Sequence, residues 1–158
     1  MSLRRVRLPP ELAGQLWLGP MPGRFNAWPA FEAQAQRAGL ALVVCLTPRS
    51  ELAELSPDYH AAVVAGRLGF RWLHLPMRNF GVPEDPAGFR REVGEIAGAI
   101  HRGDAVLLHC AAGMGRTGTT AACVLKALGL DAQDALQRVR DAGSNPQNAE
   151  QSGIVDWF

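Results

Sequence analysis

The sequence predicts an α/β domain in which a central, largely parallel sheet is flanked by helices on both faces. Short apolar segments alternate with helical patterns along the chain, which is the order expected of strands covered by helices. Two of the apolar runs, residues 40–46 and 105–108, are continuous, and this is typical of strands buried on both faces. The 158 residues are 47% hydrophobic, enough for one packed core, so we expect a single domain over residues 1–158.

Proline and glycine mark the ends of several expected elements. Pro29 suits the first turn of a helix, and Gly39 suits its end. Residues 47–50 are expected to end the strand at 40–46. The expected strands are residues 15–19, 40–46, 70–75 and 105–108. The expected helices are residues 29–38, 57–67, 86–101, 116–128, 131–141 and 147–158.

Composition argues against several classes of function. The formal net charge is +1 and no basic run is interleaved with aromatic residues, so we expect no nucleic-acid partner. No segment approaches the ~18 apolar residues that cross a bilayer, and the basic N-terminus lacks the apolar run of a signal peptide, so we expect no membrane partner. The three cysteines have no metal-type spacing, which predicts reduced thiols, a cytoplasmic location, and neither a metal nor another cofactor.

Residues 106–119 carry the main chemical signal. They predict a strand, a tight loop and the N-terminus of a helix, with Cys110 opening the loop and Arg116 closing it. Inward-facing backbone amides and the positive end of the helix dipole suit an anion, and they also favour the thiolate form of Cys110. The planar fork of Arg116 is suited to binding two oxygens of a tetrahedral oxyanion. The candidate anion-binding residues are Ala111, Ala112, Gly113, Met114, Gly115 and Arg116.

Residues 109–118 read His-Cys-Ala-Ala-Gly-Met-Gly-Arg-Thr-Gly. This segment resembles the His-Cys-x5-Arg-Ser/Thr loop of the cysteine-dependent protein tyrosine and dual-specificity phosphatases. The resemblance implies a protein tyrosine phosphatase-like fold of the dual-specificity type and a metal-independent phosphocysteine mechanism. In that mechanism Cys110 is the nucleophile, Arg116 binds the phosphate and the Thr117 hydroxyl eases departure of the thiolate. His109 is expected to support the loop through hydrogen bonds, and it also suits an ordinary buried, hydrogen-bonded histidine.

Other interpretations use the same residues. Residues 113–118 match the glycine pattern of a dinucleotide-binding fingerprint, but that pattern is expected in the first strand-helix unit, with an acidic residue ending the next strand. Here the pattern comes late, and Asp131 and Asp134 lie in a helical segment. A nucleotide P-loop is excluded because no Gly-Lys-Ser/Thr is present. A glycine-rich turn that simply buries Cys110 is the structural alternative.

Residues 77–86 contain the candidate proton donor. They resemble the mobile acid loop of the tyrosine phosphatases, Trp-Pro-Asp-x-Gly-Val-Pro, but the position of the general acid is occupied by Asn79, whose amide has no acidic proton to give. Three interpretations are open. Asp85 or Glu84 supplies the proton, the substrate is an aryl phosphate whose leaving group needs less help, or the domain binds phosphorylated ligands with little turnover. Acidic residues at 84–85 also suit capping of the helix that follows.

Two further groups of residues complete the predicted site. Gln147 and Gln151 resemble the Gln-Thr-x-x-Gln element of the family, which implies that Gln147 holds the attacking water and Gln151 assists. Three arginines follow predicted strands or the turns after them and are candidates to frame the mouth of the pocket, with ordinary surface positions as the alternative. These are Arg24, Arg49 and Arg78.

The sequence therefore predicts a cysteine-dependent phosphatase that hydrolyses phosphate monoesters. The variable positions of the loop carry no lysine, which favours a phosphorylated protein or a small phosphomonoester over a more highly charged substrate. With Asn79 at the acid position, phosphotyrosine is preferred, and phosphoserine and phosphothreonine are further candidates. The alternative is a module that binds phosphorylated ligands and turns over little or not at all.

Overall fold

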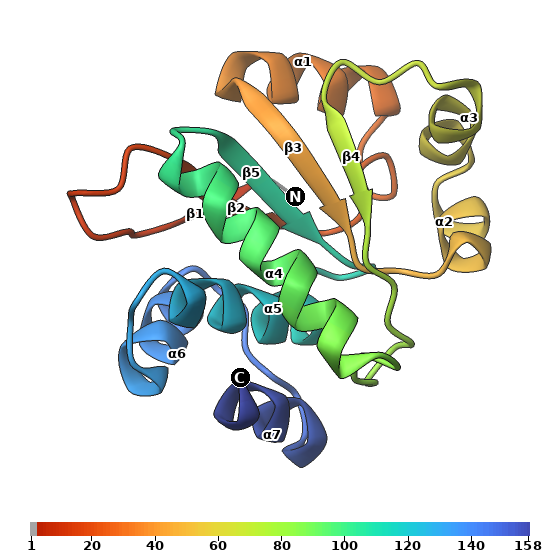
Figure 1. Cartoon of the computed structure of the whole chain (residues 1–158). Coiled ribbons are helices and arrows are strands. Elements are labelled where there is room, and N and C mark those ends of the chain that lie inside the picture. Colours follow the sequence, from red (N-terminus) through yellow and green to blue (C-terminus); the bar gives the residue numbers. More distant parts are fainter. Residues whose placement is uncertain (1–2) are drawn as a thin grey trace.

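Five strands form one sheet in the computed structural model, which describes residues 3–158. The order across the sheet is β1-β2-β5-β3-β4, so β5 lies in the centre (Figure 1). Only the edge strand β1 runs antiparallel to its neighbour, and the other pairs are parallel. The predicted largely parallel sheet is therefore confirmed. The strands are β1 (Arg4–Val6), β2 (Gln15–Gly19), β3 (Leu40–Cys45), β4 (Arg71–His74) and β5 (Ala105–His109).

Helices cover both faces of this sheet. One core lies between the sheet and α4, α5, α6 and α7, and a second core contains side chains of α1, α2 and α3 (Figure 1). Alternate residues of β5 point into the two cores: Val106 and Leu108 into the first, Leu107 into the second. The helices are α1 (Trp28–Ala38), α2 (Arg49–Leu55), α3 (Pro57–Ala65), α4 (Pro86–His101), α5 (Gly115–Ala127), α6 (Ala132–Asp141) and α7 (Ala149–Trp157).

Two elements differ from the sequence prediction. The strand β1 was not expected, because two of its three residues are arginines and show no apolar pattern. The break of the strand expected at residues 47–50 is confirmed, since β3 ends at Cys45, but the helix α2, which begins at Arg49, was not expected. Strong patterns gave better boundaries: the helix expected over residues 86–101 has those bounds in α4.

The carboxyl ends of the central strands meet at one edge of the sheet. Cys45 of β3 is in register with His109 of β5 and with His74 of β4. The segments that follow these strands therefore start side by side, and this edge is where ligands bind in parallel sheets. Within residues 3–158, no helix has the length and apolar character needed to span a bilayer.

Candidate active site

Residues 110–117, here called the cysteine loop, connect β5 to the first turn of α5. The sulfur of Cys110 accepts a hydrogen bond from the Gly113 amide at 3.3 Å and another from the Thr117 hydroxyl at 3.0 Å. Cys110 is 3% exposed, so water contributes little to its solvation. Both donors stabilise negative charge on the sulfur, which is what a nucleophilic thiolate requires.

The tight path of the cysteine loop depends on glycine at two positions. Gly113 has a φ of +76°, and a Cβ atom there would lie 2.5 Å from the carbonyl oxygen of Gly19 at the end of β2. At Gly115 a Cβ atom would lie 2.6 Å from Oε1 of Gln147. A side chain at position 113 would push the loop away from the backbone of β2, whereas one at position 115 would displace the side-chain ends of Gln147 and Gln151.

Several amides of the cysteine loop are free to bind a ligand. Within the part of the chain that the structure describes, the N–H groups of Ala111, Ala112 and Met114 donate no hydrogen bond to the protein. The loop ends at the N-terminus of α5, where the helix dipole adds positive potential. Free amides beside a helix N-terminus suit an oxyanion.

Arg116 is fixed by an ion pair that the sequence analysis did not anticipate. Its two terminal nitrogens donate to the two carboxylate oxygens of Glu51 in α2, at 2.8 and 2.9 Å, and Nη1 also donates to the Met77 carbonyl at 3.0 Å. These bonds use three of the five guanidinium hydrogens and leave Nε and one hydrogen of Nη2 for a ligand. Burial lowers the pKa of Arg116, but the hydrogen bonds with Glu51 and the nearby Cys110 outweigh it and raise that pKa.

His109 belongs to a buried hydrogen-bond chain behind the cysteine loop. The indole N–H of Trp72 donates to the Tyr59 oxygen at 2.8 Å, which leaves the phenolic hydrogen for Nε2 of His109 at 2.7 Å. Nδ1 of His109 then carries a hydrogen and donates it to the Cys110 carbonyl at 3.1 Å. Burial lowers the pKa of His109 from 6.5 to about 4, so the ring is neutral near pH 7. His109 therefore contacts the backbone of the nucleophile and not its sulfur.

Residues 76–85, here called the Asn79 loop, carry the candidate acids, and in the described part of the chain neither acid is hydrogen-bonded or ion-paired to the cysteine loop. Asn79 is exposed in a turn. The Asp85 carboxylate accepts the Gly88 amide at 3.1 Å, which confirms the interpretation of this segment as a cap for α4. Asp85 and Glu84 line a pocket of about 310 Å³ that includes no residue of the cysteine loop. In this arrangement a role for Asp85 as general acid stays a prediction.

The C-terminal glutamines connect the two loops. Gln147 lies beside Gly115 at the start of α5, and its backbone amide donates to Oε1 of the buried Gln151 at 2.9 Å. Nε2 of Gln151 donates to the carbonyl of Gly81 at 3.1 Å. Beside it, Asn148 donates to the carbonyl of Phe80 at 2.8 Å. The predicted pair thus spans from the cysteine loop to the Asn79 loop.

The three arginines predicted to frame the pocket lie in different surroundings. Arg24 donates to the Ala111 carbonyl of the cysteine loop at 3.0 Å. Arg49 lies over the ring of Trp72, with 5.6 Å between the guanidinium carbon and the ring centroid. The side chain of Arg78 is 86% exposed and 3.9 Å from Glu84. Only Arg24 touches the cysteine loop among these three.

Sequence reasoning missed Glu51 and Tyr59, which orient Arg116 and His109. A signal for Glu51 was present, because the residue closely follows the strand at 40–46, whose end must lie beside Cys110 in a parallel sheet. Tyr59 carried no comparable signal, since it lies buried in α3 as an ordinary core aromatic would.

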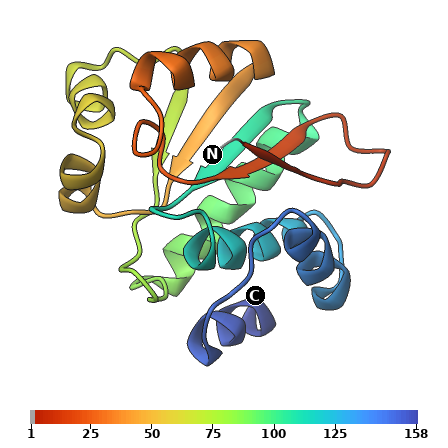
Figure 2. The same cartoon turned by 180° about the vertical axis from the view of Figure 1, so that it is seen from behind.

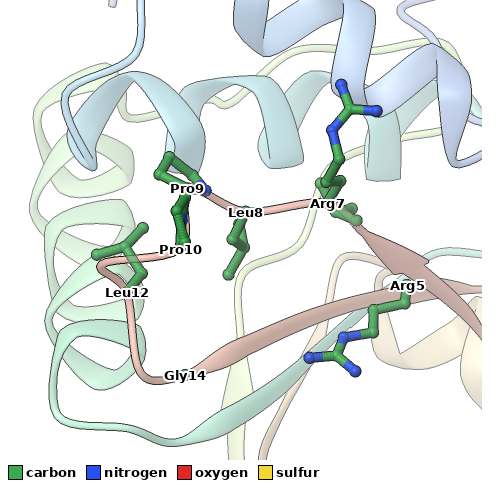
Figure 3. Close-up of a pocket in the computed structure, with 8 residues that line it drawn as sticks. Arg5, Arg7, Leu8, Pro9, Pro10, Leu12 and Gly14 are labelled. Atoms are coloured by element: carbon green, nitrogen blue, oxygen red, sulfur yellow. The ribbon is translucent and has the colours of Figure 1, made fainter.

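One further cavity has no residue of the cysteine loop in its lining. A pocket of about 520 Å³ lies beside β1 and the loop after it, with Arg5, Arg7 and Leu8 among its lining residues (Figure 3). All its lining residues fall between Arg5 and Gly14, far in sequence from the cysteine loop. Over residues 3–158, no group of three or more His, Cys, Asp or Glu side chains is arranged to hold a metal ion.

The chain is similar to solved phosphatase structures over nearly its whole length. The kinase associated phosphatase with a serine in place of its catalytic-site cysteine matches with a TM-score of 0.84 and 20% identity, covering 98% of this chain and 92% of that chain. Tk-PTP in its active form matches with a TM-score of 0.71 and 24% identity, covering 95% of this chain and 97% of that one. The human tyrosine phosphatase-like serine/threonine/tyrosine-interacting protein gives a TM-score of 0.69 at 22% identity, covering 97% and 93%. These likenesses show the fold.

The family is shown by the sequence itself. Residues 28–152 match the family model described as "PTP-SAK: Swiss Army Knife protein, DSP-PTPase phosphatase domain". This range includes the cysteine loop, the Asn79 loop and both glutamines, and it covers more than half of the chain. The chain therefore belongs to the PTP-SAK family, the dual-specificity type of protein tyrosine phosphatase domain found in Swiss Army Knife proteins.

Proposed function

We propose that this protein hydrolyses phosphate monoesters through a phosphocysteine intermediate on Cys110, with phosphotyrosine and other aryl phosphates as preferred substrates. The observation that carries the proposal is the surroundings of one sulfur atom. The Cys110 sulfur accepts hydrogen bonds from Gly113 and Thr117. Over residues 3–158, the loop also has backbone amides that donate to no protein group, and the hydrogen bonds of Arg116 come from Nη1 and Nη2 and not from Nε. A nucleophile and a binding site for its electrophile thus share one loop.

The first chemical step transfers the phosphoryl group to sulfur. The Cys110 thiolate attacks phosphorus, a sulfur–phosphorus bond forms, and the bond from phosphorus to the leaving oxygen breaks. The free edge of Arg116 and the loop amides bind the non-bridging oxygens and stabilise the charge that develops on them. The leaving oxygen carries away the electron pair of its bond and takes a proton from water or from a nearby acid.

The second step restores the thiolate. A water molecule that Gln147 holds attacks phosphorus, the new oxygen–phosphorus bond forms, and the sulfur–phosphorus bond breaks. Its electron pair returns to Cys110, and inorganic phosphate is the product. The Thr117 hydroxyl, 3.0 Å from the sulfur, stabilises the departing thiolate by hydrogen bonding.

Two features support an aryl substrate. Asn79 cannot donate an acidic proton, so a leaving group that is stable as an anion reacts better than an alkoxide. Exposed apolar side chains also occur in the segments around the cysteine loop: Phe25 is 50% exposed, Phe80 is 57% exposed and Met114 is 36% exposed. Such side chains favour contact with an aromatic ring attached to the phosphate.

The second candidate function is a module that binds phosphorylated ligands with little turnover. Its support is the Asn79 loop, in which the Asp85 carboxylate already caps α4 and Glu84 is exposed near Arg78. Within residues 3–158, neither carboxyl group makes a hydrogen bond or an ion pair with the cysteine loop. For Asp85 to act as the acid, it would have to leave its cap. The predicted cytoplasmic location and the predicted lack of nucleic-acid and membrane partners stay predictions.

The decisive experiment compares an aryl with an alkyl phosphate. We expect the wild type to hydrolyse p-nitrophenyl phosphate much faster than an alkyl phosphate, and Cys110→Ser to lose at least about a thousandfold in kcat. Trapping of a phosphorylated wild-type enzyme by rapid acid quench, absent in Cys110→Ser, tests the intermediate. If the wild type turns over both substrates no faster than Cys110→Ser, the proposed phosphatase activity is refuted and the binding module is favoured.

A further inference from the structure

Two carbonyl groups of the cysteine loop are held by donors from outside the loop. The Gly113 carbonyl accepts Nη2 of Arg4 at 2.7 Å and the Ser144 hydroxyl at 2.6 Å. The Ala111 carbonyl accepts Nη1 of Arg24 at 3.0 Å and the backbone amide of Met21 at 3.2 Å. Each carbonyl therefore has one arginine and one further donor.

These contacts determine where the neighbouring amides point. A trans peptide group directs its C=O and its N–H in opposite directions. The Gly113 carbonyl shares a peptide group with the Met114 amide, and the Ala111 carbonyl shares one with the Ala112 amide. Donors that hold the two carbonyls outward therefore turn the two amides inward, and neither amide donates to another group in the described part of the chain.

We propose that Arg4 is a positioning residue for oxyanion binding, which fixes the peptide between Gly113 and Met114 so that the Met114 amide faces the phosphoryl group. The inference rests on the proposed function. Arg4 reaches the cysteine loop from β1, 109 residues away in sequence. Arg24 has the same kind of contact with the peptide between Ala111 and Ala112, and its contribution is smaller.

The shape of the arginine side chain explains why it suits this position. Nη1 of Arg4 donates to the Ala142 carbonyl and to the Ser144 hydroxyl at 3.0 Å, while Nη2 donates to Gly113. A planar fork reaches these three acceptors at once, and a lysine ammonium at the end of a flexible stem does not match the same geometry. The burial of Arg4 lowers its pKa, whereas the negative charge of Cys110 acts in the opposite direction.

The two arginines differ in what remains when each is removed. Without Arg24, the Ala111 carbonyl still accepts the Met21 amide, whose position the backbone fixes. Without Arg4, the Gly113 carbonyl keeps only Ser144, a hydroxyl that rotates and that Arg4 itself holds. Loss of Arg4 thus loosens both donors of its carbonyl, and loss of Arg24 loosens one.

The test measures oxyanion binding and turnover separately in the full chain. Tungstate affinity by calorimetry and kcat and KM for p-nitrophenyl phosphate are measured for the wild type and for Arg4→Met, Arg4→Lys, Arg24→Met and Ser144→Ala. Arg5→Met is the matched control, because Arg5 is the next residue of β1, is exposed and lies over Trp17. All assays are made well below each variant's unfolding midpoint, so that a loss of stability alone changes neither affinity nor KM.

We expect Arg4→Met to weaken tungstate binding by about ten- to a hundredfold, as loss of a hydrogen bond to a charged group does. Arg4→Lys should recover part of that loss, Arg24→Met should weaken binding by less than about tenfold, and Arg5→Met should match the wild type. Unchanged tungstate affinity and KM in Arg4→Met would overturn the inference while the proposed function stands. If Arg4→Met does not fold, unchanged affinity in both Arg4→Lys and Ser144→Ala overturns it equally.

The proposed function fails in a different way. A wild type that neither binds tungstate nor hydrolyses the aryl phosphate overturns the proposed function, and this inference falls with it. A wild type that binds tungstate without turnover leaves the binding module in place, and the affinities of the Arg4 variants still decide the role of Arg4.

Discussion

The cysteine loop and the Asn79 loop lie at the same edge of the sheet, yet their polar groups are held very differently. In the cysteine loop, the sulfur, two carbonyls and the guanidinium of Arg116 each have at least two hydrogen-bond partners. In the Asn79 loop, Asn79 is exposed, and the loop is attached to α7 through the carbonyls of Phe80 and Gly81. The nucleophilic half of the site is therefore preorganised, whereas the proton-donating half is not assembled around Cys110.

The largest expected effect comes from the centre of the preorganised half. Arg116→Lys should lower kcat/KM for p-nitrophenyl phosphate by about a hundred- to a thousandfold, because an ammonium cannot pair with both oxygens of Glu51 and also bind two phosphate oxygens. Steady-state kinetics and tungstate calorimetry measure the change. Arg138→Lys, in α6, where the half-buried Arg138 pairs with Asp134, is the matched control. If kcat/KM of Arg116→Lys is within threefold of the wild-type value, the guanidinium of Arg116 is not the centre of a preorganised site.

His109 gives the next effect, on stability as a function of pH. Its pKa is lowered from 6.5 to about 4 in the folded protein, so the unfolded chain binds more protons between these two values. The free energy of unfolding should therefore fall as the pH drops from about 6.5 to about 4, by on the order of 3 kcal/mol. Urea denaturation at a series of pH values measures it.

A variant separates His109 from the other titrating groups. His109→Gln should lose most of this pH dependence, although its stability at pH 7 is lower. His101→Gln, which replaces an exposed histidine, should keep the dependence. Equal slopes in the two variants would show that the buried chain behind the cysteine loop does not govern acid stability.

A smaller effect is expected from the partner of Arg116. Glu51→Gln should lower kcat/KM by about tenfold, because it keeps the shape of the side chain but removes the charge that holds the guanidinium. Glu54→Gln, in the same helix, should leave kcat/KM unchanged. If Glu51→Gln and Glu54→Gln have the same kcat/KM, the charge of Glu51 is not needed to orient Arg116, and its other contacts are sufficient.

The smallest effect belongs to the Asn79 loop. Asp85→Ala should lower the free energy of unfolding by about 1 kcal/mol through loss of the α4 cap, and Asp85→Asn should preserve it, since asparagine is also a good N-cap. Thermal or urea denaturation measures both. If Asp85→Asn keeps its stability and yet loses the basic limb of the pH-rate profile, that result would identify Asp85 as an acid that moves to the site during the reaction.

The sequence predicted best what depends on local pattern. The continuous apolar run of β5, the glycines after it and the spacing of Cys110 and Arg116 are all contained in one short segment. Long-range partners were missed for the same reason: Glu51 is 65 residues from Arg116, and Tyr59 is 50 residues from His109. A single sequence contains no direct signal for such pairs beyond the convergence of strand ends.

The strand β1 illustrates this limit most clearly. Three residues, two of them arginines, lack the alternation that predicts a strand. It lies beside β2 at the edge of the sheet (Figure 2), where its position comes from antiparallel pairing with β2. The contacts of Arg4 with Ala142, Ser144 and Gly113 also hold it there. In the sequence, Arg4 is typical of a solvated surface residue. Its three acceptors lie far away in the sequence, and only the fold brings them to it.

The contact between Arg4 and Ser144 also has a consequence for biosynthesis, since it joins residues 140 positions apart in the chain. A ribosome adds Ser144 well after Arg4 and the cysteine loop, so the nascent chain carries the loop for some time without Ser144, one of the two donors to the Gly113 carbonyl. Contacts of such high sequence separation form late in folding because the loop that they close is long. The set of contacts that orients the Gly113 peptide is thus complete only after Ser144 has been synthesised.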